Sequence, residues 1–264
     1  MEDKRYENII YDKSEKIAVI TLNRPDKLNA INMEMAMELK DALLDLEKDE
    51  NIKVGIITGA GEKAFCVGGD ISTFPKILAN ITSSYNWNKL GYDIHRLMER
   101  IEKPLIAAVN GHCLAGGLEI ALACDFIIAS DNASFGLAEI TIGIVPAWGG
   151  MIRLPRAIPA RKAKEMIYTG ESVSVQEAAR IGLVNRVVPK SQLHEVVNEI
   201  AKKLADKSSL ALKVAKNVIN YGLETPDIDA GLLMERGAAG IFAAGEDSKE
   251  GVSAFLEKRK PKFK

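Results

Sequence analysis

The chain has 264 residues, of which 47% are hydrophobic and 27% are charged, and its formal net charge is −1. This composition is typical of a globular protein, and the balanced charge argues against a nucleic-acid binder, which usually carries a strong basic excess. No stretch approaches the roughly 18 uncharged apolar residues that a membrane-spanning helix needs. We therefore expect a protein that binds neither nucleic acid nor membrane.

The N-terminal residues Met1 to Tyr6 lack the apolar core of a secretory signal. The three cysteines, Cys66, Cys113 and Cys124, form an odd-numbered set without metal-ligand spacing. We interpret them as reduced packing residues, so the sequence predicts a cytoplasmic protein without a metal site.

The first part of the chain alternates short apolar runs with helical patterns. Residues 8–11 and 17–22 predict two strands around a polar turn. Asn32 is typical of an N-cap, and the apolar spacing after it predicts a helix to about Asp49. Residues 54–58 predict another strand. The polar stretch 71–90 predicts a mobile loop or loosely formed helices.

The middle of the chain continues this alternation. A helix is expected to end near Ile101, and a buried strand follows at residues 105–109. A glycine-rich turn leads into an apolar helix at 118–123, and residues 126–129 predict the next strand. Alternation of strands and helices to about residue 190 favours an α/β architecture.

The C-terminal part of the sequence is helical. Helical patterns cover residues 191–205, 209–221 and 228–244, and a last short helix precedes the basic tail at 258–262. The sequence therefore divides at about residue 190 into an α/β part and a helical part.

Two glycine-containing turns, at residues 64–71 and 110–119, each follow a predicted strand. Small residues let a ligand approach the backbone closely, and a helix start leaves N–H groups without acceptors. Such donors suit an oxygen that develops negative charge. The alternative, equally open for either turn taken alone, is that the glycines only allow tight strand–helix packing.

Two glutamates, Glu119 and Glu139, lie among apolar neighbours. A carboxylate in such surroundings is destabilising unless it is paired, solvated or functional. Catalysis and a structural hydrogen-bonding role remain equally open for each residue from its local sequence.

Several ordered motifs together resemble the enoyl-CoA hydratase/isomerase (crotonase) superfamily. Residues 106–126 resemble its signature, in which Asn-Gly is followed by Ala-Gly-Gly and a closing Cys-Asp. The other similar segments are the family's coenzyme A loop at 22–30, its first oxyanion segment at 64–71, its second catalytic segment at 135–150, and its C-terminal tail at 255–261. The similarity runs nearly end to end.

The resemblance implies a crotonase-like spiral of ββα units over residues 1–190, which would carry the coenzyme A site and the catalytic residues. It also implies that the helical region 191–264 drives trimer formation, so we expect a homotrimer or a homohexamer made from two trimers. The apolar face of the helix at 228–244 fits such a contact, although packing in the core of the same chain explains it equally well.

The resemblance also implies roles at individual positions. The backbone N–H groups of Gly69 and Gly116 match the pair that holds the thioester oxygen. Glu119 matches the carboxylate that activates or positions water, and Glu139 matches the one that supplies a proton to Cα. Two carboxylates favour a hydratase acting on an α,β-unsaturated acyl-CoA, because isomerases of this family generally need only one. No cofactor is expected, since coenzyme A is part of the substrate.

The coenzyme A contacts implied by the resemblance come from three segments. Val67 is expected to contribute its backbone to the adenine site, and Lys258 to reach coenzyme A phosphates bound by a neighbouring subunit. The remaining candidates are Arg24, Lys27, Ala64, Asp70 and Ile71.

Two features depart from the common hydratase pattern. Ala138 replaces a proline that often precedes the second glutamate, and Ala147-Trp148 replaces two small residues. Trp148 is therefore predicted either to reshape the acyl pocket or to cover it.

Other functions are less compatible with the sequence. Acidic side chains in the helix at 33–50 outnumber Lys40 and Lys48, so RNA binding, known from one branch of the superfamily, is disfavoured. An isomerase, a dehydratase acting in reverse and a thioester hydrolase remain alternatives on the same fold. His95, on a predicted surface helix, is interpreted as structural, as are the other two histidines.

Overall fold

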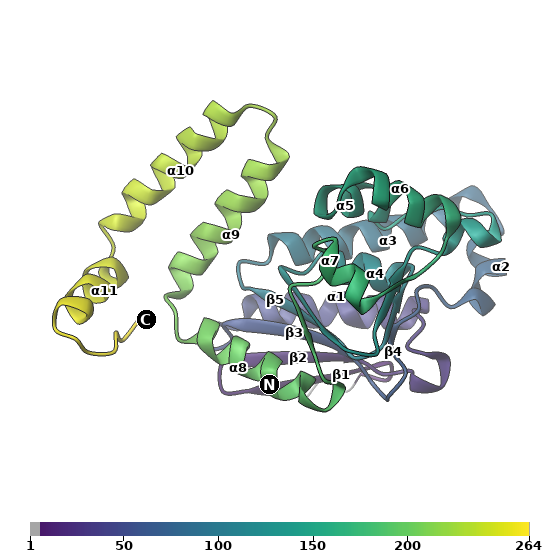
Figure 1. Ribbon diagram of the computed structural model, residues 1–264, viewed down its shortest axis with the longest axis horizontal. Coiled ribbons are helices and arrows are strands. Elements are labelled where there is room, and N and C mark those ends of the chain that lie inside the picture. The colour runs from purple at the N-terminus through teal and green to yellow at the C-terminus, as the bar shows by residue number, and fades with distance from the viewer. Residues whose placement is uncertain (1–5, 264) are drawn as a thin grey trace.

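Two β-sheets form the body of the protein, whose computed structural model describes residues 6–263 (Figure 1). The larger sheet has the order β1 (Ile9–Ser14), β2 (Ile17–Leu22), β3 (Val54–Gly59), β5 (Leu105–Val109), β7 (Phe126–Ser130) and β10 (Arg186–Val188). The smaller sheet has the order β4 (Ala64–Cys66), β6 (His112–Leu114), β8 (Ser134–Gly136) and β9 (Val173–Ser174). The prediction that the N-terminus lacks a secretory signal concerns residues 1–6. Of these, residues 1–5 lie outside the described residues.

Successive strands alternate between the two sheets. β3, β5 and β7 pair in parallel in the larger sheet, and each is followed by a strand of the smaller sheet, where β4, β6 and β8 also pair in parallel. Helical segments follow each strand pair. All residues of β3 and β5 are buried, as expected for parallel strands covered on both faces. The predicted α/β fold of repeated ββα units is confirmed.

The helical segments follow the strands in chain order. The α-helices are α1 (Met33–Lys48), α2 (Phe74–Ile77), α3 (Ile81–Arg100), α4 (Gly116–Leu122), α5 (Gly150–Ala157), α6 (Ala160–Thr169), α7 (Val175–Arg180), α8 (Leu193–Ala205), α9 (Ser209–Glu224), α10 (Ile228–Ala243) and α11 (Glu246–Leu256). The 3-10 helices are η1 (Pro25–Lys27), η2 (Ile71–Thr73), η3 (Glu139–Ile142) and η4 (Lys190–Gln192). As predicted, Asn32 caps α1, where its side chain accepts the Met35 N–H at 3.0 Å.

The prediction of a mobile loop or loose helices at 71–90 is wrong for its second half. α3 begins at Ile81, and the side chain of Asn80 caps it by accepting the Ser83 N–H at 2.9 Å. Polar residues in the first turns of α3 mask its apolar periodicity. The residues that α3 buries start at Trp87 and continue to Met98.

His95 is also misplaced by the sequence, because it is fully buried on α3 rather than exposed. Its Nδ1 atom lies 2.7 Å from the Gly91 carbonyl oxygen. Burial lowers the pKa of His95 to about 4, so the ring is neutral at physiological pH.

The helical C-terminal region consists of two parts. α8 packs on the larger sheet, where Leu193, Val197, Ala201 and Ala205 join an apolar cluster with strand residues. Helices α9 to α11, residues 209–256, extend from one side of the body and are called the arm below (Figure 1). α8 therefore packs with the body, and only α9 to α11 extend from it; the predicted division of roles at about residue 190 stays a prediction.

The arm is attached to the body by α9. The Lys216 side chain is 6% exposed and pairs with Asp125 at 2.8 Å, and it also donates to the carbonyl oxygens of Met98 and Lys103. Asn220 donates to the carbonyl oxygen of Glu99 at 3.0 Å. By contrast, α10 has no fully buried residue: it packs against α9, but Ile228, Leu232, Leu233 and Ile241 on it are exposed, so packing within this chain does not account for its whole apolar face.

Asn29 ties the loop before α1 to the turn between β3 and β4. Its side-chain N–H groups donate to the carbonyl oxygens of Ala60 and Ala64, both at 2.9 Å, and its side-chain oxygen accepts the Arg24 N–H at 3.0 Å. Asn29 is fully buried and has a left-handed φ of 57°. Asparagine tolerates this φ better than most residues.

We expect Asn29→Ala to lower the free energy of unfolding by about 3 kcal/mol, because buried backbone groups lose their partners. Urea denaturation at fixed protein concentration measures the change. Asn51→Ala, at an exposed turn, is the control and should stay within about 0.5 kcal/mol of the unsubstituted protein. Equal midpoints for the two variants would contradict this account.

Candidate active site

A cavity of about 630 Å³ brings together the two glycine turns and both predicted catalytic glutamates. Gly69, Gly116, Glu119, Glu139 and Trp148 all contribute to its lining. The rest of its wall is largely apolar and includes residues of η2, α2, α3 and the segment that follows η3. A cavity of this size and chemistry suits a small organic ligand held by a few polar groups.

The two glycine turns lie side by side because β4 and β6 pair in parallel, with Cys66 opposite Cys113. A Cβ atom built on Gly116 would lie 3.8 Å from the Gly69 nitrogen. Within residues 6–263, the Gly69 N–H has no hydrogen-bond acceptor. Gly116 opens α4, so its N–H has no acceptor within the helix. Two unengaged donors therefore lie next to each other at the cavity.

Ala115 precedes the second of these donors and has an unusual backbone conformation, with φ 50° and ψ −128°. Such a conformation is strained for a residue with a side chain and is found preferentially at functional sites. Its own N–H donates to the Gly136 carbonyl oxygen at 2.8 Å, which holds the turn in place. The sequence carries no signal for this strain.

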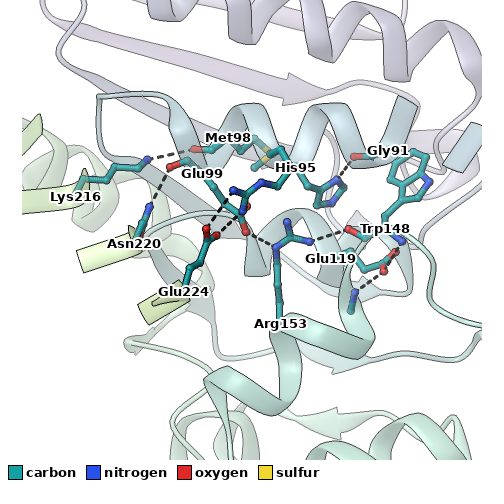
Figure 2. Close-up of polar contacts among 12 residues, drawn as sticks. Gly91, His95, Met98, Glu99, Glu119, Trp148, Arg153, Lys216, Asn220 and Glu224 are labelled. Carbon is teal, nitrogen blue, oxygen red and sulfur yellow. Dashed lines mark hydrogen bonds and ion pairs between the residues drawn. The ribbon is translucent and has the colours of Figure 1, made fainter. Parts of the chain in front are cut away.

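Glu119 is 2% exposed on the first turn of α4. Its Oε1 atom accepts two backbone N–H groups, from Trp148 at 2.9 Å and from Gly150 at 2.7 Å (Figure 2). Burial raises the pKa of Glu119 to about 6, although these N–H groups favour its charged form. The sequence left open whether Glu119 is functional or structural. Its Oε1 atom has a structural role, since the backbone engages it, and its other carboxyl oxygen is left for a functional one.

Glu139 is the first residue of η3 and is 9% exposed. Its Oε2 atom is buried and has no hydrogen-bond partner among the residues that the structure describes. Burial, with a smaller contribution from the charge of Glu119, raises the pKa of Glu139 to about 7. A buried carboxyl oxygen without a partner is available to a ligand in the cavity.

Trp148 forms part of the cavity wall and is 4% exposed. Its ring centroid lies 4.7 Å from that of Trp87 and 5.6 Å from that of His95. Gly91 makes room for it, because a Cβ atom there would lie 2.2 Å from indole atoms. Sequence reasoning missed Gly91, Trp87 and His95 as neighbours of this wall; their helical spacing was the available signal.

The predicted coenzyme A contacts are only partly brought to this cavity. Lys27, Val67, Asp70 and Ile71 line it. The Arg24 guanidinium instead pairs with Asp70 at 2.8 Å, and the pKa of Asp70 is lowered, first by the Ser72 hydroxyl and also by Arg24.

Two further candidates lie away from the cavity lining. Ala64 is buried within β4, and its carbonyl oxygen accepts a hydrogen bond from Asn29. Lys258 follows α11, in a tail whose Lys260 pairs with Asp206 at the end of α8 at 2.7 Å. Neither residue reaches the cavity of its own chain.

Among residues 6–263, no group of three or more histidine, cysteine, aspartate or glutamate side chains is placed to hold a metal ion. In the same residues, no helix has the length and apolar character required to cross a membrane.

Comparisons with known proteins match this chain along nearly its whole length. A family model for enoyl-CoA hydratase/isomerase matches residues 12–264. The crotonyl-CoA hydratase of Syntrophomonas wolfei is 44% identical over 258 residues, which cover 98% of each protein. The short-chain-enoyl-CoA hydratase of Clostridium acetobutylicum is 43% identical over 253 residues, which cover 96% of each.

Solved structures agree with the sequence comparisons. The crystal structure of an enoyl-CoA hydratase from Bacillus anthracis superposes with a TM-score of 0.93 at 40% identity, over 98% of this chain and 99% of that one. Since the family model and several relatives of high identity match almost from end to end, the chain belongs to the enoyl-CoA hydratase/isomerase family.

Proposed function

We propose that this protein adds water across the carbon–carbon double bond of an α,β-unsaturated acyl-CoA thioester, or catalyses the reverse dehydration. The observation that carries the proposal is the presence of two buried carboxyl groups and two unengaged backbone N–H groups in one cavity. The names of relatives that are 43–44% identical support the same reaction. The chemistry requires no cofactor, because coenzyme A is part of the substrate.

In this mechanism, the N–H groups of Gly69 and Gly116 donate to the thioester oxygen. Attack of water on Cβ moves negative charge onto that oxygen, so donors placed there stabilise the enolate-like transition state. One such donor typically contributes about 3–4 kcal/mol.

The two glutamates divide the proton transfers. Glu119 accepts a proton from the attacking water, whose oxygen bonds to Cβ, and Glu139 gives its proton to Cα. A proton then returns from Glu119 to Glu139 through solvent, which restores the starting state. Their pKa values of about 6 and about 7 fit this division, because at neutral pH Glu119 is more ionised than Glu139.

An isomerase is the second candidate, because the family model includes isomerases as well as hydratases. Moving one proton between two carbons needs only one carboxyl group. Both Glu119 and Glu139 line the cavity, which favours the hydratase.

We further propose that the arm forms subunit contacts in a homotrimer or a homohexamer. The apolar side chains of α10 are exposed in the single chain, for example Ile228 at 73% and Ile241 at 81%. A neighbouring subunit would bury them. Lys258, two residues after the arm, is then available to coenzyme A bound by the neighbour.

We also propose a cytoplasmic location. Cys66 and Cys113 are neighbours across the parallel pair β4–β6, yet both are free thiols, as is Cys124. Unpaired cysteines are typical of a reducing compartment.

Substituting each glutamate separately tests the hydratase. We expect Glu119→Gln and Glu139→Gln each to lower kcat for hydration of crotonyl-CoA by about 10²–10⁴-fold, because each removes one proton-transfer group. The assay monitors hydration through the decrease in absorbance of the enoyl thioester. Glu195→Gln, at an exposed position, is the control. An enzyme that isomerises a 3-enoyl-CoA and survives Glu119→Gln would be an isomerase instead.

The pH dependence of kcat/KM provides a second test. As pH falls below about 6, Glu119 gains a proton and can no longer act as a base. As pH rises above about 7, Glu139 loses the proton it must donate. We expect a bell-shaped profile with limbs near these values, in the hydration direction. A rate that stays constant from pH 5 to about 8 would exclude both assignments.

Trp148 is proposed to limit the length of the acyl chain. We expect Trp148→Ala to raise kcat/KM for 2-octenoyl-CoA relative to crotonyl-CoA by about tenfold, because loss of the indole lengthens the apolar cavity. A panel of enoyl-CoA thioesters measures the ratio. Tyr85→Ala, which removes an exposed aromatic side chain from α3, should leave it unchanged. An unaltered ratio in Trp148→Ala would show that the acyl group lies elsewhere.

A further inference from the structure

A row of charged side chains connects α9 of the arm with the loop that holds Glu119 (Figure 2). Arg153 donates from Nε to Glu99 Oε1 at 2.5 Å, and Arg96 donates to Glu99 Oε2 at 2.7 Å. Arg96 also donates to Glu224 Oε1 at 2.5 Å. These four residues, Arg153, Glu99, Arg96 and Glu224, are called the ion-pair chain below.

Arg153 contacts the Glu119-binding loop directly. Its Nη1 atom donates to the Trp148 carbonyl oxygen at 2.9 Å. The guanidinium also lies against Gly149, where an added Cβ atom would lie 1.6 Å from Nη1. Gly149 has a left-handed φ of 114°, which turns the chain between the two residues that donate to Glu119.

The loop is thus held from two sides. On one side, the N–H groups of Trp148 and Gly150 point to Glu119 Oε1, and on the other side the intervening peptide carbonyl points to Arg153. The peptide that carries this carbonyl also carries the Gly149 N–H, which is a further backbone group that lowers the pKa of Glu119. A rotation of this peptide would break the bond to Arg153 and turn the Gly149 N–H away from Glu119. The position of the Glu119 carboxylate therefore depends on a residue that does not line its cavity.

Burial makes the inner part of the ion-pair chain stronger than a surface ion pair. The side chains of Arg153, Glu99 and Arg96 are 16%, 22% and 21% exposed, whereas that of Glu224 is 47% exposed. Partly buried pairs are screened less by solvent and salt. We expect the influence on the loop to decrease from Arg153 outward to Glu224.

We propose that Arg153 is a positioning residue that orients the loop of residues 148–150 and thereby fixes Glu119, with Glu99 holding the guanidinium in place. Through Arg96 and Glu224, attachment of α9 to the body supports the same loop. This inference rests on the role proposed above for Glu119, and it adds a link between the arm and the reaction.

Arg153→Lys tests the inference, because lysine keeps the positive charge and cannot bridge Glu99 and the Trp148 carbonyl as the planar guanidinium does. We expect kcat for crotonyl-CoA to fall by about tenfold, since small misplacements of catalytic groups strongly reduce rate. KM should stay within about twofold, because the substrate-binding groups are unaltered. Arg156→Lys, at an exposed position of the same helix, is the matched control and should behave like the unsubstituted enzyme.

The pH profile separates positioning from a general loss of structure. The N–H groups of Gly150 and Trp148 lower the pKa of Glu119, so a displaced loop should raise it. We expect the acid limb of kcat/KM to move upward by about half a pH unit or more in Arg153→Lys and to stay in place in Arg156→Lys. Should Arg153→Lys fail to fold, Glu99→Gln gives the same readout with Arg153 present.

Failure of the positioning role of Arg153 can be told apart from failure of the proposed hydratase function. If Glu119→Gln retains full hydratase activity, the role of Glu119 itself is wrong. If Glu119→Gln is inactive while Arg153→Lys matches Arg156→Lys in both kcat and acid limb, only the positioning role is overturned.

The arm end of the ion-pair chain has its own test. We expect Glu224→Gln to lower kcat by about two- to threefold with an upward shift of the acid limb, and to cause no further loss when combined with Arg153→Lys. Glu195→Gln, at an exposed position of α8, is the control. An unchanged Glu224→Gln enzyme, or losses that simply multiply, would overturn the link to the arm.

Discussion

The hydrogen bonds between Glu119 Oε1 and the backbone of Trp148 and Gly150 are the contacts on which the site depends most. A carboxylate inside an apolar helix is strongly destabilising unless donors replace its lost hydration. The last part of the loop before α5 and the first residue of α5 supply these donors, so they approach Glu119 from outside α4. The positions of α4, α5 and the loop between η3 and α5 are therefore coupled through one oxygen atom. This arrangement leaves the second carboxyl oxygen of Glu119 for the reaction that we propose.

The repeated strand pairs explain how the remaining groups converge. Gly69 follows β4, Gly116 and Glu119 follow β6, and Glu139 follows β8. Because β4, β6 and β8 pair in parallel, the segments after them meet at the same edge of the smaller sheet. Each successive unit thus contributes one part of the cavity. The same principle places ligand sites at the carboxyl ends of parallel strands in other α/β proteins.

The elements whose sequence signals are local were predictable. The cap and apolar stripe of α1 lie within one helix, and the bounds of β5 agree with its apolar run. His95 and Lys216 were not predictable, because their burial depends on partners distant in the chain. Lys216, for example, pairs with Asp125, and nothing in the local sequence of α9 distinguishes it from an exposed lysine. The glycine turns were predicted to form a ligand site only through several motifs in a fixed order.

Gly91 lies in the middle of the 20-residue helix α3, where glycine disfavours the helix by about 1 kcal/mol relative to alanine. Its missing side chain is the space that the Trp148 indole occupies. The identity of the residue at 148 is therefore constrained by a backbone position 57 residues earlier in the chain, which is not itself part of the cavity lining. A protein with this backbone could exchange its indole for a smaller group without a steric clash, but it could acquire a methyl group at 91 only after that exchange. Sterics thus set the order in which these two positions can diverge.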